Sequence, residues 1–250
     1  MGRFYRLVRK FLNYPEVNRT SQSGFLTWIR DAIDFEHIYD GGAARGGFSL
    51  AASKVWPDAH FYLFEPLKEF EENLENLPIK NSHVLLCALT ESAGMVRINV
   101  HPDLYGSSIY EEIEGTAVNG TPRQVAATTL NDFFQTEGHR LVKLDLQGAE
   151  IDALDGGDKF FSEIKPGSET VFLLEVNLWN NMIGSSNQFA NIVDYFASRG
   201  FVLLDICGVL RRPLDGATAQ VDLAFCHSDS VLRKDHRYAT LEQRRMQFGK

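Results

Sequence analysis

The sequence predicts an α/β fold: a doubly wound, mostly parallel sheet with an antiparallel hairpin at one edge. The first observation is that strand-like apolar runs alternate with helix-like segments along most of the chain. The second is that these runs are apolar on both faces, which is typical of parallel strands covered by helices on both sides. The third is that the last two runs have no helix between them, which indicates an antiparallel pair.

Strand-like runs and helix-like segments follow each other in a regular order. The strand-like runs are at 37–41, 60–64, 83–89, 141–146, 170–176, 201–207 and 221–226. The helix-like segments are at 48–55, 67–76, 149–154, 159–164 and 188–198. Right-handed crossovers through such helices build a doubly wound sheet. Two further strand-like runs, 95–100 and 125–129, flank a polar loop at 103–120, which we expect to be mobile.

This pattern divides the chain into three parts. Residues 1–36 form a helical extension, because apolar residues recur there at helical spacing opposite basic ones. We expect this extension to dock on its own domain, although its first helix could instead contact an anionic membrane. Residues 37–228 form the ligand-binding domain, and residues 229–250 form a C-terminal tail.

The composition narrows the classes of function. The net charge is -8, which argues against duplex nucleic acid as a partner, because phosphate binding needs a broad basic surface. Small molecules, sugars and proteins stay open as partners. The three cysteines form no disulfide framework, and no apolar run is long enough to span a bilayer. We therefore expect a cytoplasmic protein.

A glycine-rich turn follows the first strand-like run, with the pattern Asp-x-Gly-x-x-x-Gly at Asp40, Gly42 and Gly46. Such a turn lets the backbone approach a ligand closely. The middle glycine of the dinucleotide-binding pattern is missing, since Ala43 or Ala44 stands there. Asp40 would repel a pyrophosphate but suits the sulfonium and ammonium groups of S-adenosylmethionine. The turn therefore favours S-adenosylmethionine as cofactor over NAD; the purely structural alternative is a tight turn in which Asp40 caps the next helix.

Glu65 ends the second strand-like run and is followed by Pro66. An acid at this position can accept hydrogen bonds from both ribose hydroxyls of an adenosine. The proline fixes the end of the strand. Glu65 is therefore the second element of the predicted cofactor site.

Several motifs resemble those of one family. Residues 143–150 read Lys-Leu-Asp-Leu-Gln-Gly-Ala-Glu, which resembles the signature K-I/L-D-V/L-E/Q-G-A/Y-E of the FkbM family of methyltransferases. Residues 129–133 resemble the T-L-D-D-F/L element of that family, and the glycine turn and Phe-Glu-Pro at 64–66 resemble two more of its blocks. Ser107 and Ser108 are similar to its serine-rich loop. One departure is Ala44, where the family more often has asparagine.

The resemblance implies a Rossmann-like class I methyltransferase fold and methyl transfer, commonly to a hydroxyl oxygen of a sugar or sugar-containing metabolite. It implies that Asp40, Gly42 and Glu65 hold S-adenosylmethionine and that Asp145 faces the methyl group at the carboxyl end of its strand. Gly46, from the same turn, and Ser107, from the serine-rich loop, complete the candidate cofactor-binding residues.

Methyl transfer to a hydroxyl needs a base, or a metal, to take its proton. Asp145 and Glu175 are the catalytic candidates, because they stand near the sheet edge where ligands bind in such folds. We prefer Asp145 as the base; positioning of the cofactor is an equally open role for it. The two acids could share a divalent cation, but no histidine or cysteine spacing supports a softer metal, and we assign no metal ligands.

Other residues and functions stay open at this stage. Arg211 and Arg212 could bind a phosphate of a sugar-nucleotide acceptor. His227 is discounted, because an antiparallel last strand would place it at the wrong edge. The alternative functions are an NAD-dependent oxidoreductase and a non-catalytic cofactor-binding domain. The sequence identifies neither the acceptor nor the oligomeric state.

Overall fold

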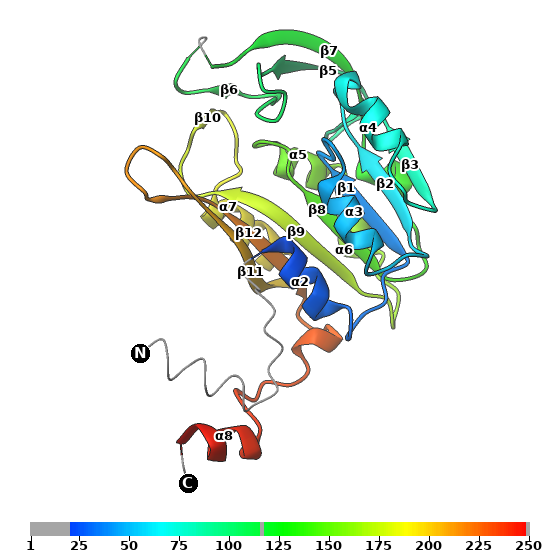
Figure 1. Ribbon diagram of the computed structural model, residues 1–250, viewed down its shortest axis with the longest axis vertical. Coiled ribbons are helices and arrows are strands. Elements are labelled where there is room, and N and C mark those ends of the chain that lie inside the picture. The colour runs from blue at the N-terminus through cyan, green and yellow to red at the C-terminus, as the bar shows by residue number, and fades with distance from the viewer. Residues whose placement is uncertain (1–20, 116–117, 249–250) are drawn as a thin grey trace.

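A seven-stranded sheet with helices on both faces forms the body of the molecule, and a smaller sheet lies beyond one end of it (Figure 1). The computed structural model describes residues 21–115 and 118–248. The first helix expected in the extension 1–36, with its alternative membrane contact, lies outside these residues.

The strands of the main sheet are β1 (His37–Gly41), β2 (His60–Phe64), β3 (Ser82–Leu85), β8 (Arg140–Leu144), β9 (Thr170–Asn177), β11 (Phe201–Arg211) and β12 (Thr218–His227). Their order is β11-β12-β9-β8-β1-β2-β3. Neighbours among β3, β2, β1, β8 and β9 are parallel, whereas β12 is antiparallel to both β9 and β11. The predicted doubly wound sheet with an antiparallel hairpin is therefore confirmed.

One detail of the strands differs from the prediction, and another, the strand order within the hairpin, was not predicted. The run 83–89 forms two strands, β3 and β4 (Ala88–Leu89), because the chain turns between them, where the Cys87 N–H donates to the carbonyl of Leu85. In the hairpin, the later strand β12 lies inside the sheet beside β9, and the earlier strand β11 forms the edge.

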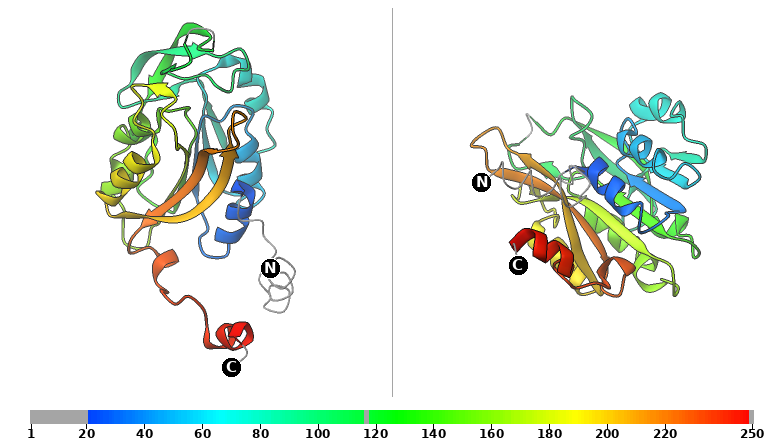
Figure 2. Two further views of the ribbon diagram at one scale, coloured as in Figure 1. Left: turned by 90° about the vertical axis from the view of Figure 1, so that its left-hand side faces the viewer. Right: turned by 60° about the horizontal axis from the view of Figure 1, so that its bottom comes forward.

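Helices cover both faces of the sheet. On one face lie α2 (Gln22–Ile29), α3 (Gly47–Ser53) and α4 (Glu71–Glu75), whose apolar side chains share a buried cluster with the strands. On the other face lie α5 (Glu150–Asp155), α6 (Lys159–Ser162) and α7 (Phe189–Ala197). The left-hand view of Figure 2 shows these blue and green-to-yellow helices on opposite sides of the strands.

Strand β9 shows why two helix layers are needed. Its side chains alternate between the two buried clusters: Val171 and Leu173 point to one, and Phe172 and Leu174 to the other. All four are almost completely buried. A strand that is apolar on both faces is stable only between two covering layers, as the sequence predicted.

The two extra strand-like runs form strands β5 (Gly94–Val100) and β7 (Thr121–Thr128). They pair antiparallel, and β7 also pairs with β4 in a separate three-stranded sheet. Two short strands, β6 (Glu111–Glu112) and β10 (Met182–Ile183), form a further pair. These pieces lie beyond the carboxyl ends of the parallel strands (Figure 1). Strands β4 and β5, with the loop that follows β5, form one wall of the pocket described below.

Three short 3-10 helices and one terminal helix complete the described chain: η1 (Lys68–Phe70), η2 (Leu130–Phe133), η3 (Val231–Arg233) and α8 (Leu241–Phe248). Helix α8 and η3 belong to the segment 229–250, for which the sequence predicted a tail. Among the residues described, no helix has the length and apolar character to cross a membrane.

Candidate active site

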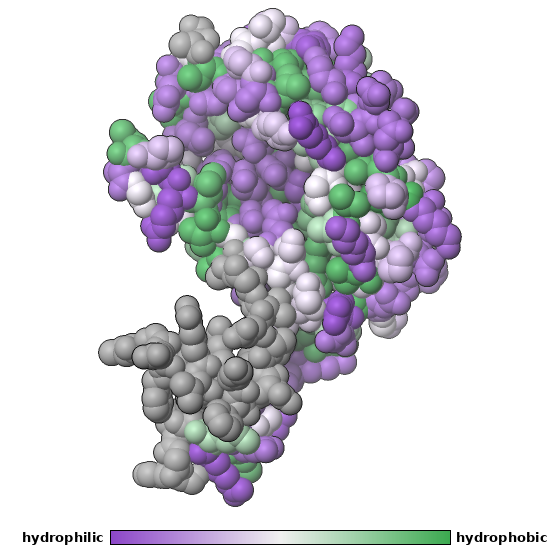
Figure 3. All heavy atoms as spheres, in the orientation of Figure 1, coloured by the Kyte–Doolittle hydropathy of each residue, from purple (hydrophilic) through white to green (hydrophobic). Residues whose placement is uncertain are grey.

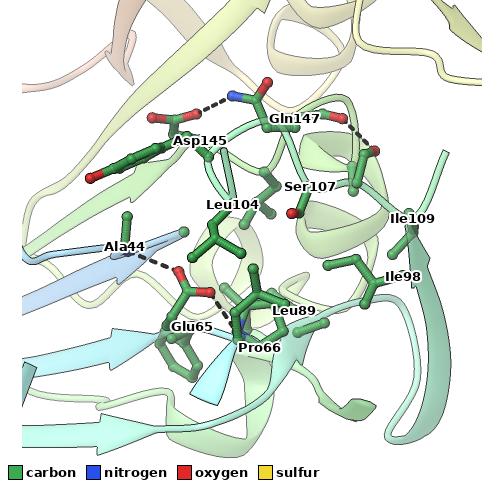
Figure 4. A pocket seen from close by; sticks show the side chains of 18 of the residues that line it. Ala44, Glu65, Pro66, Leu89, Ile98, Leu104, Ser107, Ile109, Asp145 and Gln147 are labelled. Atoms are coloured by element: carbon green, nitrogen blue, oxygen red, sulfur yellow. Dashed lines mark hydrogen bonds between the residues drawn. The ribbon is translucent and has the colours of Figure 1, made fainter. Parts of the chain in front are cut away.

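A pocket lies at the carboxyl ends of β1, β2 and β8, where the strand order of the sheet reverses. Ligands bind at this position in open α/β sheets. The pocket encloses about 760 Å³, part of which is open to solvent, and ligand clefts typically measure roughly 300–1,000 Å³. Its polar lining includes Glu65, Ser107, Asp145 and Gln147 (Figure 4). Tyr105 and Ser108 line it as well.

The glycine turn after β1 touches the end of β8. Gly42 has φ +71°, and a Cβ there would lie 1.9 Å from the carbonyl oxygen of Asp145. Only glycine fits this close approach. Gly46 has φ +76° and precedes α3, but it does not line the pocket; a Cβ there would lie 2.3 Å from the side chain of Leu77. The structure therefore brings Gly42 into the pocket and gives Gly46 a packing position behind it.

Glu65 joins the turn to the end of β2. One of its carboxylate oxygens accepts a hydrogen bond from the Ala44 N–H at 2.8 Å, and the other accepts from the Leu67 N–H at 2.9 Å. Burial raises the pKa of Glu65, while these two N–H groups lower it. Each oxygen of a carboxylate can accept a second hydrogen bond. Glu65 lines the pocket (Figure 4), so it has capacity left for two hydroxyl groups of a ligand.

Asp40 lies beneath the pocket and not on its surface. Its side chain is fully buried, where it forms an ion pair with Lys143 at 3.1 Å and accepts a hydrogen bond from Ser49 at 2.6 Å. The sequence predicted this charge beside the ligand. In the structure, it faces Lys143, whose ammonium group also donates to the carbonyls of Gly41 and Gly42. Asp40 therefore holds the turn against β8.

Asp145 and Glu175 are brought together by a third residue. The side-chain amide nitrogen of Gln147 donates to Asp145 at 2.9 Å and to Glu175 at 3.1 Å. Asp145 lines the pocket and also lies 3.7 Å from the ammonium group of Lys143. Glu175 lies outside the pocket, on the far side of Gln147. A hydrogen-bond donor thus occupies the position that a shared cation would take.

The two catalytic candidates differ in their charge environment. Burial, together with repulsion from Asp145, Glu150 and Asp222, raises the pKa of Glu175 to about 8. Burial likewise raises the pKa of Glu150 to about 8. A carboxyl group with such a pKa can exchange a proton near neutral pH. Asp145 instead faces the ammonium group of Lys143.

The serine-rich loop reaches the pocket from the opposite side. Ser107 lines the pocket, and its hydroxyl accepts a hydrogen bond from the His101 N–H at 3.0 Å. Its neighbour Ser108 is buried and donates to the carbonyl of Gln147 at 2.7 Å. Leu104, from the same loop, points into the pocket (Figure 4). Ser108, Leu104 and Gln147 received no role from the sequence, although two of them stood inside recognised motifs.

Apolar side chains form the deeper part of the pocket. They come from the end of β2, from η1 and the residue before it, from β4 and β5, and from the serine-rich loop: Phe64, Leu67, Phe70, Leu89, Ile98 and Ile109. Such a surface suits a planar ring system, and the carboxylates at its rim suit hydroxyl and cationic groups. The whole lining therefore fits a ligand with an aromatic ring, a diol and a positive charge.

The remaining polar candidates lie elsewhere. Arg212 is paired with Asp215 within the β11–β12 connection and stacks on Trp179, and Arg211 donates to the carbonyl of Gly216. His227 ends β12 opposite the start of β11, at the edge away from the pocket, as expected. In the described parts of the chain, no three histidine, cysteine, aspartate or glutamate residues are grouped to hold a metal ion.

A glycine turn after β1 and an acid at the end of β2, both at the reversal point of the sheet, are typical of the Rossmann-like class of α/β folds. Residues 40–203, well over half of the chain, match the model of the methyltransferase FkbM domain. The chain therefore belongs to the FkbM family and is a methyltransferase.

Individual relatives are distant in sequence. "Methyltransferase 1" of Beauveria bassiana (strain ARSEF 2860) is 23% identical over 193 residues, which are 68% of this chain and 74% of that protein. The precorrin-6y C5,15-methyltransferase of Geobacter metallireducens GS-15 aligns with 11% identity and a TM-score of 0.46, over 82% of this chain and 86% of that one. The 1,6-didemethyltoxoflavin-N1-methyltransferase of Burkholderia thailandensis, solved with S-adenosylhomocysteine bound, aligns with 10% identity and a TM-score of 0.47, over 89% and 88%.

Proposed function

We propose that this methyltransferase binds S-adenosylmethionine in the pocket and methylates a hydroxyl oxygen of a sugar or sugar-containing small molecule. The observation that carries the proposal is the position of Glu65. It ends β2, is fixed by two backbone N–H groups, and faces the pocket beside the glycine turn. A ribose diol is the group that an acid in this position recognises.

The other residues of the pocket fit the rest of the cofactor. The apolar side chains around Leu89 and Ile98 would hold the adenine ring, and Ser107 offers a hydroxyl at the rim. Asp145 would stand beside the cationic end of the cofactor. Asp40 would act indirectly, because it fixes the turn through Lys143.

When bound, S-adenosylmethionine supplies an electrophilic methyl group on a sulfonium. The chain must then align the acceptor oxygen with that group and take the proton of the hydroxyl. We assign the role of accepting the hydroxyl proton to Glu175, because its raised pKa matches a base that works near neutral pH. We assign Asp145 to orientation, because it lines the cofactor pocket and is held there by Gln147 and Lys143. Gln147 holds the carboxylates of Asp145 and Glu175 in position relative to each other.

Isothermal titration with S-adenosylmethionine, S-adenosylhomocysteine and NAD tests the cofactor. We expect both adenosyl ligands to bind and NAD not to bind. Glu65→Gln should weaken S-adenosylhomocysteine binding at least about tenfold, since it loses a charge-assisted acceptor for the diol. Glu72→Gln, an exposed position on α4, is the control and should bind as the wild type does. Binding of NAD alone, or unchanged binding by Glu65→Gln, would overturn the cofactor assignment.

Transfer of a labelled methyl group to a panel of sugars and glycosides tests the reaction. Glu175→Gln should lower kcat at least about a hundredfold, the scale expected when a general base is lost, while S-adenosylhomocysteine still binds. Methylation of an amine or a carbon atom instead of oxygen would contradict the proposed chemistry. Absence of transfer to every acceptor, with the cofactor bound, would favour a non-catalytic binding domain.

A further inference from the structure

A second cleft adjoins the cofactor pocket, and we call it the acceptor cleft. It lies over β9, β12, β11 and the first residues of α2, and it encloses about 780 Å³, part of it open to solvent. Its polar lining is Ser21, Gln22, Ser23, Glu175, Gln220 and Asp222. Figure 3 shows a hollow lined by hydrophilic side chains on this face of the molecule.

Gln147 marks the boundary between the two spaces. It lines the cofactor pocket, and its amide nitrogen donates both to Asp145 in that pocket and to Glu175 in the acceptor cleft. A group transferred past Asp145 therefore arrives beside Glu175. In the described structure, the acceptor cleft is the polar space that a second substrate would occupy at that point.

The strand register places one carboxylate directly beside Glu175. Asp222 on β12 is the partner of Glu175 on β9, and Gly208 on β11 is the partner of Asp222. A Cβ on Gly208 would lie 2.1 Å from a carboxylate oxygen of Asp222. The missing side chain at Gly208 thus leaves room for the Asp222 carboxylate on the floor of the cleft.

Neutral amides are the hydrogen-bond partners of these two acids. Gln22 donates to Asp222 at 3.1 Å, and Gln220 donates to Glu175 at 2.8 Å. The nearest cation, Lys143, forms its ion pairs with Asp40 and Asp145. Within residues 21–115 and 118–248, neither acid of the cleft has an ion pair with a lysine, arginine or histidine. Both carboxylates are half-buried, and Lys143 acts on Asp222 only from a distance, without an ion pair. A half-buried carboxylate without an ion-pair partner favours the entry of a cation.

This charge distribution selects the class of acceptor. A phosphorylated sugar would be repelled, and Arg211 and Arg212 are engaged within their own hairpin. A metal ion would need a third ligand, and no such group of three exists among the described residues. An alkylammonium group needs only one carboxylate and hydrogen-bond acceptors such as the amide oxygen of a glutamine.

We propose that the acceptor cleft binds a polyhydroxylated amine, with its ammonium group on Asp222 and the hydroxyl to be methylated facing Glu175. This inference rests on the proposed function, because the cleft is the acceptor site only if the methyl group is delivered past Asp145. The ammonium group would also favour the ionised form of Glu175, since the two acids are neighbours in the ladder. Binding of the amine thereby prepares Glu175 to accept the hydroxyl proton.

Titration calorimetry on the full chain saturated with S-adenosylhomocysteine tests this inference. The probes are kanamycin A, which carries four amines among its hydroxyls, its tetra-N-acetyl derivative and glucose 6-phosphate. We expect kanamycin A to bind at least tenfold more tightly than either of the others. Asp222→Asn should lose most of this preference and keep its affinity for S-adenosylhomocysteine. Glu91→Gln, which removes one exposed charge far from the cleft, should behave as the wild type does.

The comparison of the three probes on the wild-type chain tests the inference even if a variant folds poorly. Equal binding of kanamycin A and its acetylated form, absence of binding by kanamycin A, or preference for glucose 6-phosphate would each overturn the inference. An unchanged preference in Asp222→Asn would do the same. None of these results touches the cofactor assignment, which fails only if S-adenosylhomocysteine itself does not bind.

Discussion

In the described parts of the chain, the residues other than glycine with a positive φ are Ala44, Leu104 and Gln147, and all three line the cofactor pocket. Such backbone conformations cost of order 1–3 kcal/mol each and collect at functional sites. The three residues come from three different loops. The strained residues therefore lie at the same pocket that the glycine turn and Glu65 identify, and they are an independent indication of a functional site.

Ala44 offers a direct measure of this strain. Its φ of 46° lies in the left-handed region, which asparagine tolerates better than alanine does. We expect Ala44→Asn to stabilise the protein by about 0.5–1 kcal/mol, or roughly 1–4 °C in Tm. Urea denaturation of the two proteins measures the difference.

The matched control is Ala51→Asn. Ala51 is half-buried like Ala44 but lies within α3, where asparagine is a poorer helix former than alanine. This substitution should lower the free energy of unfolding by roughly 0.5 kcal/mol. If both variants shift in the same direction, the conformational explanation for Ala44 fails.

The raised pKa of Glu175 predicts how stability depends on pH. Its folded pKa, about 8, lies above the ordinary value of a glutamate because of burial and of repulsion from Asp145, Glu150 and Asp222. At pH values between its ordinary pKa and its folded pKa, Glu175 binds more protons in the folded state than in the unfolded state. Its contribution to the free energy of unfolding is therefore complete at low pH and is lost as the pH rises toward 8. We expect Glu175→Gln, which cannot ionise, to become more stable than the wild type by at least about 1 kcal/mol at pH 8.

Urea denaturation at pH 5, 6, 7 and 8 gives the comparison. The difference between Glu175→Gln and the wild type should grow steadily with pH, whereas the exposed control Glu91→Gln should show no trend of this kind. A difference that is independent of pH would mean that Glu175 ionises normally in the folded chain. It would then also be a poor base for the proposed reaction.

Among the structural elements, the turn from β1 to α3 tolerates substitution least. Gly42→Ala would place a Cβ against the Asp145 carbonyl in a backbone conformation that disfavours it. We expect a loss of at least about 3 kcal/mol, together with loss of cofactor binding, because overpacking and strain add. Gly47→Ala, at the first residue of α3, would meet no atom within 4 Å and should be neutral or slightly stabilising. Denaturation of Gly42→Ala and Gly47→Ala measures the change in stability, and ligand titration measures the change in cofactor binding.

The loop between β5 and β7 shows what an element-level prediction misses. Its polar composition predicted a mobile segment at 103–120, yet Ser108 is buried and bonded to the turn after β8. That hydrogen bond spans 39 positions in the sequence. Local composition carries no information about such a contact, so the sequence could suggest Ser107 by motif but could not place Ser108 or Leu104 in the pocket.

At the scale of the whole molecule, the fold followed from patterns that are local in the sequence. Apolar runs, their spacing and the missing helix before the last strand were sufficient for the sheet and its antiparallel hairpin. The placement of charge was not predictable in this way. Asp40 was expected beside the ligand, and its pairing with Lys143, 103 positions later in the sequence, depends on two strands that meet in register. Glu65, in contrast, is set by its own strand end, and the structure places it in the pocket.

The pairing of Asp40 with Lys143 connects the two halves of the sheet at the point where the strand order reverses. Lys143→Met would leave Asp40 buried without its cation, and we expect a loss of about 3–5 kcal/mol. Adding Asp40→Asn should recover about 1–3 kcal/mol, since the uncompensated charge is then gone and the bond from Ser49 can persist. Lys54→Met, an exposed substitution, should change stability by no more than about 0.5 kcal/mol. Additive losses in the double variant would show that the two halves do not depend on this ion pair.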